Sequence, residues 1–450
     1  MHTRRRRRNY SRRGLPCADG RSDQRAKRHR KMDGDERLSE RAGTQRDRGV
    51  NPSGQATSSV LVAGAGLVGA AAALYLAERG YQVTVIDRSP PQAGISAFGM
   101  DVRNVALSPR SATLIQHVDA WPEQAAAYHR MRVWEERGSS ALDFDAASVN
   151  RDELGWLVEV GPLLNRLWEK LEVNDNIQVL LGTTQCVSRN QDRVLLTLDH
   201  PKSEKEGTIE VGADFLIACD GARSAVREAL DVPLRHWRTG QMALTTVART
   251  QNPHSQTAWQ RFLLDGPLAL LPSKDPHLCS IVWSQSEANA ETRVALTDTE
   301  FCRVLTRASE GCLGEVQAVG PRQVFPLHQQ LAATAYPNER VLLLGDALRV
   351  IHPLAGLGVN LGFEDLQEML HVVKPDTDLG VSGLWDKFAR QRLLRSELVL
   401  RSLDGLRRLY AQDDPWLGLL RNAGVDWFGR RRWLQHKAIE EATGLQDVSA

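Results

Sequence analysis

The sequence predicts an α/β protein. A doubly wound parallel sheet forms its main domain, an antiparallel sheet is inserted into that domain, and helices follow towards the C-terminal end. Apolar runs at 60–63, 214–218 and 341–344 each end in a glycine or an acid and lead into a helical pattern. Between 242 and 283, strand-like segments alternate with turn residues, which indicates an antiparallel sheet. After residue 383 apolar residues recur at helical spacing, as at Val399, Leu403, Leu406 and Tyr410.

Charge and composition divide the 450 residues into five segments. Residues 1–58 hold 17 basic and 7 acidic residues with few apolar ones, which predicts a disordered basic tail. That tail either plays no part or offers its arginines at 4–8 to an anionic surface. The remainder holds 40 basic and 48 acidic residues, which argues against a nucleic-acid partner. The other four segments are the first part of the main domain (59–230), the inserted sheet (231–335), a return segment (336–380) and a helical region (381–450).

The first motif is GAGLVG at 64–69, between a buried strand and an alanine-rich helical pattern. Gly64 permits the turn, Gly66 lets a pyrophosphate approach the backbone, and Gly69 lets the helix pack on the strand. The next strand ends at Asp87 and Arg88, and Asp87 lies 18 residues beyond Gly69, near the place of a ribose-binding acid. The motif therefore predicts dinucleotide binding, but it does not separate FAD from NAD. Beyond it, the runs at 179–181, 194–198 and 208–211 indicate a small antiparallel meander.

Two further positions each leave two interpretations open. Asp220 follows the strand at 214–218 and precedes Gly221, so it either accepts from a ribose hydroxyl or closes an ordinary capped turn. Arg223 and Arg227 then face phosphates or form surface ion pairs. Arg103, in the run DVRNVALSP at 101–109, either contacts a phosphate or caps the helix that follows.

The third motif begins at Gly345-Asp346, at the end of the strand at 341–344. It continues through His352-Pro353 to Gly356 and Gly358, where a helical pattern starts. Glycines at a helix start let a flat ligand approach the backbone, and the free amides favour negative charge. The arrangement suits a redox cofactor that becomes anionic when reduced, although an ordinary strand–turn–helix unit would read similarly.

Together, these three motifs resemble those of the class A flavoprotein monooxygenases, which share the para-hydroxybenzoate-hydroxylase-like fold. Within that family the chain is most similar to the ubiquinone-biosynthesis hydroxylases. The supporting segments are DVRNVALSP (101–109), LGWLVE (154–159), FPL (325–327), HPLAGLGVNLGFED (352–365) and LRNAG (420–424). The resemblance extends from about residue 59 to 445.

The resemblance implies a Rossmann-like FAD-binding domain with an inserted antiparallel-sheet substrate domain and C-terminal helices. It also implies the residues that would hold FAD, while it names no catalytic residue and no metal site. Those residues are Gly64, Gly66 and Gly69 at the pyrophosphate, Asp87 and Arg88 at the adenosine, Arg103 and Asp220 on the phosphate side, Asp346 at the ribityl chain, and Pro353, Gly356, Gly358 and Asn360 around the isoalloxazine ring.

By the same resemblance, NAD(P)H reduces the flavin, O₂ adds to give a flavin hydroperoxide, and one oxygen is transferred to an aromatic ring. The implied substrate is a prenylated phenol of ubiquinone biosynthesis. Arg349 and Leu357 stand where the family usually has His and Gln. Other interpretations are a hydroxylase of another aromatic compound, a catalytically weak FAD-binding subunit of a biosynthetic complex, and an NAD-dependent dehydrogenase.

Cysteine usage and hydropathy bear on location. The six cysteines include no Cys-x-x-Cys pair, which suggests free thiols in a reducing compartment, and no run of 18 apolar residues occurs. In the C-terminal region Trp416, Trp427 and Trp433 interleave with Arg421 and the arginines at 430–432. This pattern suits contact with a membrane surface, or equally core aromatics beside a solvated basic face. We expect a cytoplasmic protein that can dock on the inner face of a membrane.

Overall fold

The computed structural model describes residues 58–138, 141–190, 192–199, 207–352 and 356–411, together with Arg431. The expected tail at 1–58 lies outside the described residues except for its last residue. Most of the C-terminal region beyond 411 also lies outside them, including its tryptophans. The five described cysteines, at 186, 219, 279, 302 and 312, are free thiols.

The main sheet consists of five parallel strands in the order β10-β2-β1-β14-β21. They are β10 (Ile177–Leu181), β2 (Gln82–Asp87), β1 (Ser59–Ala63), β14 (Phe215–Ala218) and β21 (Val341–Leu343). The three apolar runs become the neighbouring strands β1, β14 and β21, because strands buried on both faces are apolar throughout. Residues 179–181 belong to β10 at the edge of this sheet, so their assignment to a meander is wrong.

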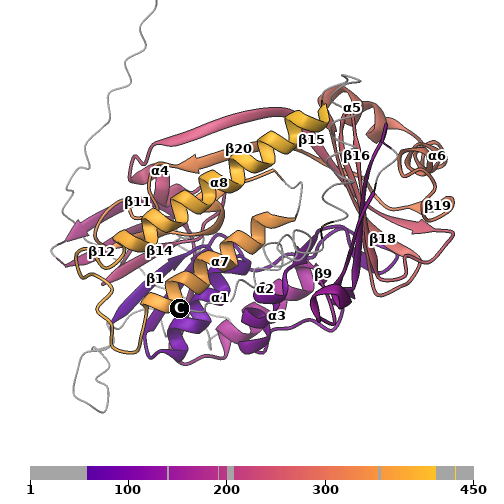
Figure 1. The fold of residues 1–450 in the computed structure, drawn as a ribbon. Helices are drawn as coiled ribbons and strands as arrows, with labels where there is room; N and C mark the ends of the chain where they lie inside the picture. Colours follow the sequence, from indigo (N-terminus) through magenta and orange to yellow (C-terminus); the bar gives the residue numbers. More distant parts are fainter. Residues whose placement is uncertain are drawn as a thin grey trace, which may run out of the picture. The chain divides into compact units, whose positions relative to one another are not determined.

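One face of the parallel sheet is covered by helices (Figure 1). These are α1 (Leu67–Glu78), α3 (Val160–Glu172) and α7 (Leu357–Val372), with α2 (Pro109–His117) beside α7. Val62, Ile217 and Leu342 point from the sheet into one apolar cluster with these helices. Because α1 lies between the sheet, α3 and α7, nearly all of its side chains are buried, which explains its run of alanines.

The opposite face is covered by a small antiparallel sheet and the short helix α4 (Ala225–Ala229). The strands are β11 (Thr183–Asn190), β12 (Arg193–Asp199) and β13 (Thr208–Ala213). On β12 alternate residues are buried, and its Leu196 and Leu198 pack with Leu61 and Leu343 of the parallel sheet. The parallel sheet is therefore enclosed by helices on one side and by strands on the other.

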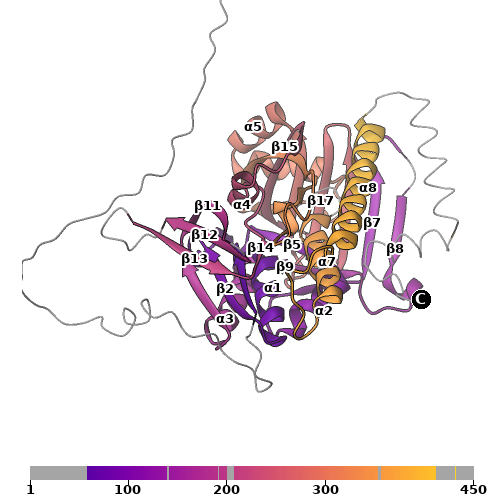
Figure 2. The same cartoon turned by 90° about the vertical axis from the view of Figure 1, so that its left-hand side faces the viewer.

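A second, nine-stranded sheet stands beside the first (Figures 1 and 2). Its neighbours are antiparallel except for the parallel pair β16–β7. In order its strands are β22 (Arg349–Val350), β20 (Gln323–Ala332), β15 (Leu234–Thr250), β18 (Leu278–Ser286), β17 (Gly266–Pro272), β16 (Thr257–Leu263), β7 (Arg130–Glu135) and β8 (Ala141–Asp145), with β19 (Val316–Val319) paired to β15. The strands expected between 242 and 283 are confirmed. Strands β7 and β8 come from a much earlier part of the chain.

Helices α5 (Glu287–Ala295) and α6 (Asp298–Ala308) pack against this second sheet. Two smaller sheets are formed by strands that lie in the sequence between β2 and α3. One contains β5 (Asn104–Leu107), β9 (Gly155–Glu159) and β6 (Ala126–Tyr128), and the other β3 (Ser96–Ala97) and β4 (Met100–Asp101). Two 3-10 turns complete the described elements, η1 (Ala146–Val149) and η2 (Gly345–Ala347).

The last described helix, α8 (Asp386–Ala411), runs from beside α7 to the second sheet (Figures 1 and 2). Val399, Leu400 and Leu403 are buried against Leu331 of β20 and Leu361 of α7. Of the expected apolar face, Val399 and Leu403 are therefore buried, whereas Leu406 is exposed. Helix α8 thus contacts both α7, which carries the third sequence motif, and the antiparallel sheet.

Candidate functional site

The carboxyl ends of β1, β14 and β21 meet at one edge of the parallel sheet, because these strands are neighbours and run parallel. All three sequence motifs follow these strand ends. Open parallel sheets bind ligands at such an edge, where the loops separate from one another. The candidate site is therefore assembled by the topology from residues that are far apart in the chain.

The first motif forms a close-packed backbone turn. Gly64 has a φ of +94°, and a Cβ atom there would lie 2.4 Å from the backbone oxygen of Cys219. A Cβ on Gly69 would lie 2.0 Å from the backbone oxygen of Gly64. Gly66 differs from both, since a Cβ atom there would meet only open space and the residue begins α1 without any side-chain cap. The amides at the start of α1 are therefore available to an anion.

A cleft of about 490 Å³ opens beside this turn. It brings together four predicted residues, Gly66, Asp87, Arg88 and Arg103. Asp87 Oδ2 accepts a hydrogen bond of 2.7 Å from the backbone amide of Ala65, so its carboxylate braces the glycine turn. The remaining lining includes Trp168 and Gln323, which the sequence did not single out.

The structure excludes one of the two interpretations of Arg103, and the phosphate contact stays a prediction. Helix α2 is capped by Ser108, whose hydroxyl accepts from the amide of Ser111, so Arg103 does not cap it. The Arg103 guanidinium is half exposed, lies 3.9 Å from Asp101 and lines the cleft. Glu159 accepts from the amide of Asp101, and burial raises the pKa of Glu159. The Arg103 cation that lines the cleft therefore has one carboxylate, that of Asp101, within 3.9 Å.

The second motif places Asp220 directly against the first. A Cβ on Gly64 would come within 2.7 Å of the Asp220 Cα. Asp220 Oδ2 accepts at 3.1 Å from the amide of Val226 in the first turn of α4, whose cap residue is Ser224, while Asp220 Oδ1 is buried with no hydrogen-bond partner among the described residues. Asp220 thus closes a turn and also keeps one free acceptor atom. Arg227 is buried and donates to the carbonyls of Ala222 and Ala347, so it neither faces solvent nor forms a surface pair.

The third motif begins with the tight turn η2. Gly345 has a φ of +58°, and its amide donates to Asp365 Oδ2 at 2.9 Å. Asp346 follows with an exposed side chain. The surrounding protein nevertheless removes part of the water around its carboxyl group and so raises its pKa, an effect that Arg349 opposes. Arg349 therefore favours the charged form of the acid expected at the ribityl chain.

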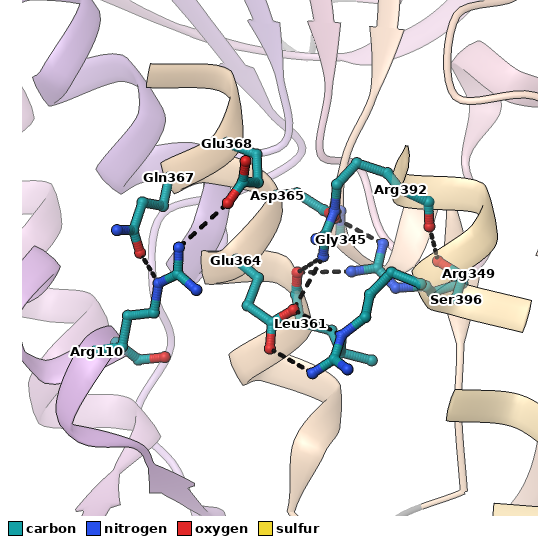
Figure 3. A network of polar contacts seen from close by, with 12 residues as sticks. Arg110, Gly345, Arg349, Leu361, Glu364, Asp365, Gln367, Glu368, Arg392 and Ser396 are labelled. Carbon is teal, nitrogen blue, oxygen red and sulfur yellow. Dashed lines mark hydrogen bonds and ion pairs between the residues drawn. The ribbon is translucent and has the colours of Figure 1, made fainter. Parts of the chain in front are cut away.

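Behind this turn lies a buried cluster of charges that sequence analysis missed (Figure 3). Asp365 on α7 is fully buried and receives 2.6 Å bonds from both Arg349 and Arg392 of α8. Both arginines also donate to the carbonyl of Leu361. Glu364 pairs with Arg392 at 3.3 Å and extends the cluster towards the surface. Asp365 is part of the segment GFED, but its partners cannot be deduced from residue spacing.

The start of α7 is built around Gly356 and Asn360. Gly356 begins the helix with a φ of +61° and without a side-chain cap, and the space around Gly358 is nearly open. The Asn360 side chain uses all of its hydrogen-bonding capacity inside the protein. Its partners are the amide of Ser108, the hydroxyl of Ser111 and the carbonyls of Ala106 and Gly356. Asn360 therefore fixes α7 to β5 and α2, and no polar group of its side chain remains for a cofactor. Pro353 lies outside the described residues.

His352 is fully buried just before this segment. Its Nε2 atom is 3.0 Å from Oε1 of Gln241, whose amide nitrogen donates to the carbonyl of Asp265, so Nε2 carries the proton. Nδ1 has no partner, and burial lowers the pKa of His352 to about 4. A neutral imidazole thus connects the third motif to strand β15.

Arg349 and Leu357, the two residues where the resemblance leads us to expect His and Gln, are both linked to α8. Arg349 forms the ion pair with Asp365 that Arg392 of α8 completes. Leu357 packs into the apolar cluster that contains Val399 and Leu403 of α8. Arg349 stands in place of the expected His and shares Asp365 with Arg392 of α8. Leu357 stands in place of the expected Gln and packs in the same apolar cluster as α8.

These features fit FAD. The uncapped starts of α1 and α7 suit anionic groups, the glycine turn leaves room for a ligand at Gly66, and the free Oδ1 of Asp220 is an unused acceptor. The cleft at Asp87 to Arg103 could take the adenosine end of such a molecule. A family model described as "FAD binding domain" matches residues 57–401. The chain belongs to this family.

Relatives and solved structures agree with that membership. The chain is 28% identical over 397 residues to the 3-demethoxyubiquinol 3-hydroxylase of Escherichia coli, which covers 86% of this chain and 99% of that protein. It is 29% identical over 426 residues to the human mitochondrial ubiquinone biosynthesis monooxygenase COQ6, covering 81% of this chain and 88% of the other. The p-nitrophenol 4-monooxygenase PnpA of Pseudomonas putida has a similar fold, with a TM-score of 0.67 at 19% identity over 87% and 99% of the two chains.

The expected resemblance, the α/β fold and the FAD cofactor are therefore confirmed, as is the enzyme class of FAD-dependent monooxygenase. The individual contacts of the site residues with FAD stay predictions. The structure does place Gly66, Asp87, Arg88 and Arg103 around one cleft, beside the backbone turn that contains Gly64. Asp220 and Asp346 lie at the neighbouring strand ends.

Proposed function

We propose that this FAD-dependent monooxygenase hydroxylates the ring of a prenylated phenol in ubiquinone biosynthesis, with O₂ and NAD(P)H as co-substrates. The observation that carries the proposal is the convergence of the glycine turn, Asp220 and Asp346 at one sheet edge, in a chain that matches ubiquinone hydroxylases along nearly their whole length. When bound, FAD supplies the redox chemistry and the activation of O₂. The protein supplies binding, orientation and exclusion of water.

Each part of the site has its own task in this proposal. Gly64, Gly66 and Gly69 let the pyrophosphate approach the start of α1, and Asp87, Arg88 and Arg103 hold the adenosine side. Asp220 and Asp346 accept hydrogen bonds from hydroxyl groups of the cofactor. The uncapped start of α7, at Gly356 and Gly358, favours negative charge on the ring side.

The substrate side is proposed to lie along β20 and β15. Val324 and Phe325 are exposed apolar residues on β20, although most of that strand's later residues are buried. They follow Gln323, which lines the cofactor cleft, and pair with Leu244 and Ala243 of β15. Exposed apolar side chains next to a cofactor cleft would receive the apolar part of an aromatic substrate.

A second candidate function is a FAD-binding subunit of a biosynthetic complex with little activity of its own. Leu357 favours it, because an apolar side chain replaces the polar Gln expected beside the flavin. We also propose a cytoplasmic location with contact at the inner face of a membrane. None of the described helices is long and apolar enough to cross a bilayer.

A quinone profile of cells that lack the gene tests the proposed function. We expect a prenylated phenol that lacks one hydroxyl group to accumulate, and the wild-type gene on a plasmid to remove it. Complementation with an Asp346→Ala variant separates the two candidates, because a subunit needed only for assembly would still restore the pool. An unchanged quinone pool in the deletion strain would contradict both.

A further inference from the structure

Helix α8 has an outer face that the proposed site does not use. Leu394 and Leu398 are 63% and 55% exposed. They are four residues apart, so they lie one turn apart on the side of the helix that faces away from the buried Leu403. We call these two residues the leucine ridge. Two large exposed apolar side chains together on the outer side of a long helix form a candidate contact surface.

The exposed charges of α8 are mostly basic. Within the described residues of α8 they are Lys387, Arg390, Arg401 and Arg408, against one exposed acid, Asp386, at the start of the helix. The other acids of the helix, Glu397 and Asp404, are only partly exposed, and each is shared by two arginines. The outer face is therefore apolar along the ridge and cationic along its border.

A cleft of about 390 Å³ opens next to this border, between α8 and the first part of β15. Its lining contains five arginines, at 235, 238, 401, 407 and 408, against the two acids Glu397 and Asp404. Three positive charges are thus left over in what we call the arginine cleft. The side chain of Arg238 is exposed and has no ion pair or hydrogen bond within the part of the chain that the structure describes. Trp237, 39% exposed, stands at the cleft with Arg235 over its ring.

We propose that the leucine ridge and the arginine cleft form one docking surface for an anionic lipid bilayer. Guanidinium groups match phosphate oxygens in geometry and charge, which suits lipid headgroups in the arginine cleft. An apolar stripe bordered by basic residues lies at the depth where headgroups meet acyl chains, and a tryptophan is favoured at the same level. The inference rests on the proposed function for its purpose, since a prenylated phenol would enter from that bilayer.

Flotation of the purified full-length holoprotein with lipid vesicles tests the proposal. We expect binding to vesicles of phosphatidylcholine with phosphatidylglycerol, and at least tenfold weaker binding to phosphatidylcholine alone. Binding should weaken in high salt, because the contribution of the arginine cleft is screened. Inorganic diphosphate should weaken binding only at concentrations where ordinary salt does so. Full displacement from the vesicles by diphosphate, at a concentration where ordinary salt has no effect, would mean that the arginine cleft binds free phosphate groups and would overturn the lipid assignment.

Two paired variants locate the surface. Leu394→Gln with Leu398→Gln, and Arg238→Gln with Arg408→Gln, should each reduce vesicle binding at least tenfold. The matched controls are Val173→Gln and Arg303→Gln, which change an exposed apolar and an exposed basic residue elsewhere and should bind as wild type does. Equal binding by wild type and both paired variants would overturn the proposal and point to residues 412–450. No binding by wild type would overturn it as well, and would fit a face covered by that segment or by another protein.

Flavin content, and NAD(P)H oxidation with a short-chain phenol in the absence of vesicles, keep this test separate from the proposed function. Neither should change in the paired variants, because these residues lie outside the cofactor site. Vesicle binding without phenol-stimulated oxidation would leave the docking surface standing and contradict the hydroxylase assignment. Phenol-stimulated oxidation without vesicle binding would support the hydroxylase assignment and overturn the docking surface.

Discussion

The two ends of the candidate cofactor site are held in place by different forces. At the β1–α1 end, backbone atoms of Gly64, Gly69 and Cys219 are so close that no Cβ fits between them. At the β21–α7 end, the turn at Gly345 is held by a buried carboxylate, Asp365, between two arginines. The first end depends on the absence of side chains, and the second depends on a balance of charge.

This difference predicts how each end fails. A methyl group is enough to disturb the first end, because the atoms in its way belong to the backbone and cannot rotate aside. The second end fails when one partner of its charge cluster is removed, because the remaining charges are then buried without compensation. Four changes, ordered by expected effect, test this contrast.

The largest effect is expected from Asp365→Asn. Loss of the negative charge leaves Arg349 buried beside neutral groups and leaves Arg392 with Glu364 as its acidic partner, which costs about 3–5 kcal/mol of unfolding free energy. Denaturant unfolding of the purified protein measures it. Glu364→Gln is the control, since Glu364 is closer to the surface and should cost much less. Equal and small losses for both variants would mean that the buried cluster does not stabilise this end.

A smaller loss is expected from Gly69→Ala. The added methyl group would lie 2.0 Å from the Gly64 oxygen, so the turn must shift, at a cost of roughly 1–3 kcal/mol and with loss of bound flavin. Gly66→Ala is the matched variant, because its Cβ meets nothing within 4 Å. We expect Gly66→Ala to leave stability unchanged and to weaken only FAD binding. If both variants unfold like wild type, the first end is not held by close backbone packing.

The third change, Asp346→Ala, should act on cofactor binding and hardly on folding. The Asp346 side chain is exposed and receives no side-chain or backbone hydrogen bond among the described contacts, so little stability depends on it. Loss of the acceptor proposed for the ribityl chain should weaken FAD binding. The loss of about one hydrogen bond to a charged group lowers the affinity for FAD roughly tenfold. Flavin absorbance per protein after gel filtration measures the change. Full flavin content in the variant would remove Asp346 from the site.

The smallest effect is a dependence of stability on pH, and it involves only the β21–α7 end. Burial lowers the pKa of His352 from 6.5 to about 4, so the unfolded chain binds a proton at a pH where the folded chain does not. Its contribution to stability is complete above pH 6.5 and falls as the pH drops towards 4, by about 1 kcal/mol at pH 5.5. The difference between wild type and His352→Gln should therefore shrink on acidification. A difference that stays constant from pH 7.5 to 5 would contradict a buried neutral imidazole.

The contrast between the ends also explains what the sequence could predict. The β1–α1 turn was predicted correctly, because its glycines act on atoms within a few residues and in one neighbouring strand. Strands β1, β14 and β21 and those between 242 and 283 were predicted for the same local reason, whereas β7, β8 and β20 were not predicted and residues 179–181 were assigned to the wrong sheet. The partners of Asp365 were not predicted, since Arg392 lies 27 residues further on and reaches Asp365 only through the packing of α8 on α7.

Some positions were misjudged because a motif specifies a residue type and not the direction of a side chain. Asn360 was expected beside the isoalloxazine ring, which stays a prediction, but the hydrogen bonds of its side chain to β5 and to the start of α2 were not foreseen. Arg227 was expected at the surface or at a phosphate, but it holds the carbonyl of Ala347 inside the protein. Arg349 and Leu357 stand where the resemblance leads us to expect His and Gln, and their contacts with Asp365 and with the apolar cluster under α8 were not foreseen. Such roles depend on tertiary packing.

One measurement tests the central claim most directly. The purified holoprotein is supplied with NAD(P)H, a short-chain prenylated phenol and ¹⁸O₂, and the phenol is analysed by mass spectrometry. We predict a product with one added oxygen that carries the label, together with NAD(P)H oxidation that depends on the phenol. A flavin-loaded protein that oxidises NAD(P)H no faster with the phenol, and gives no labelled product with it or with any other phenol tested, would contradict the hydroxylase assignment.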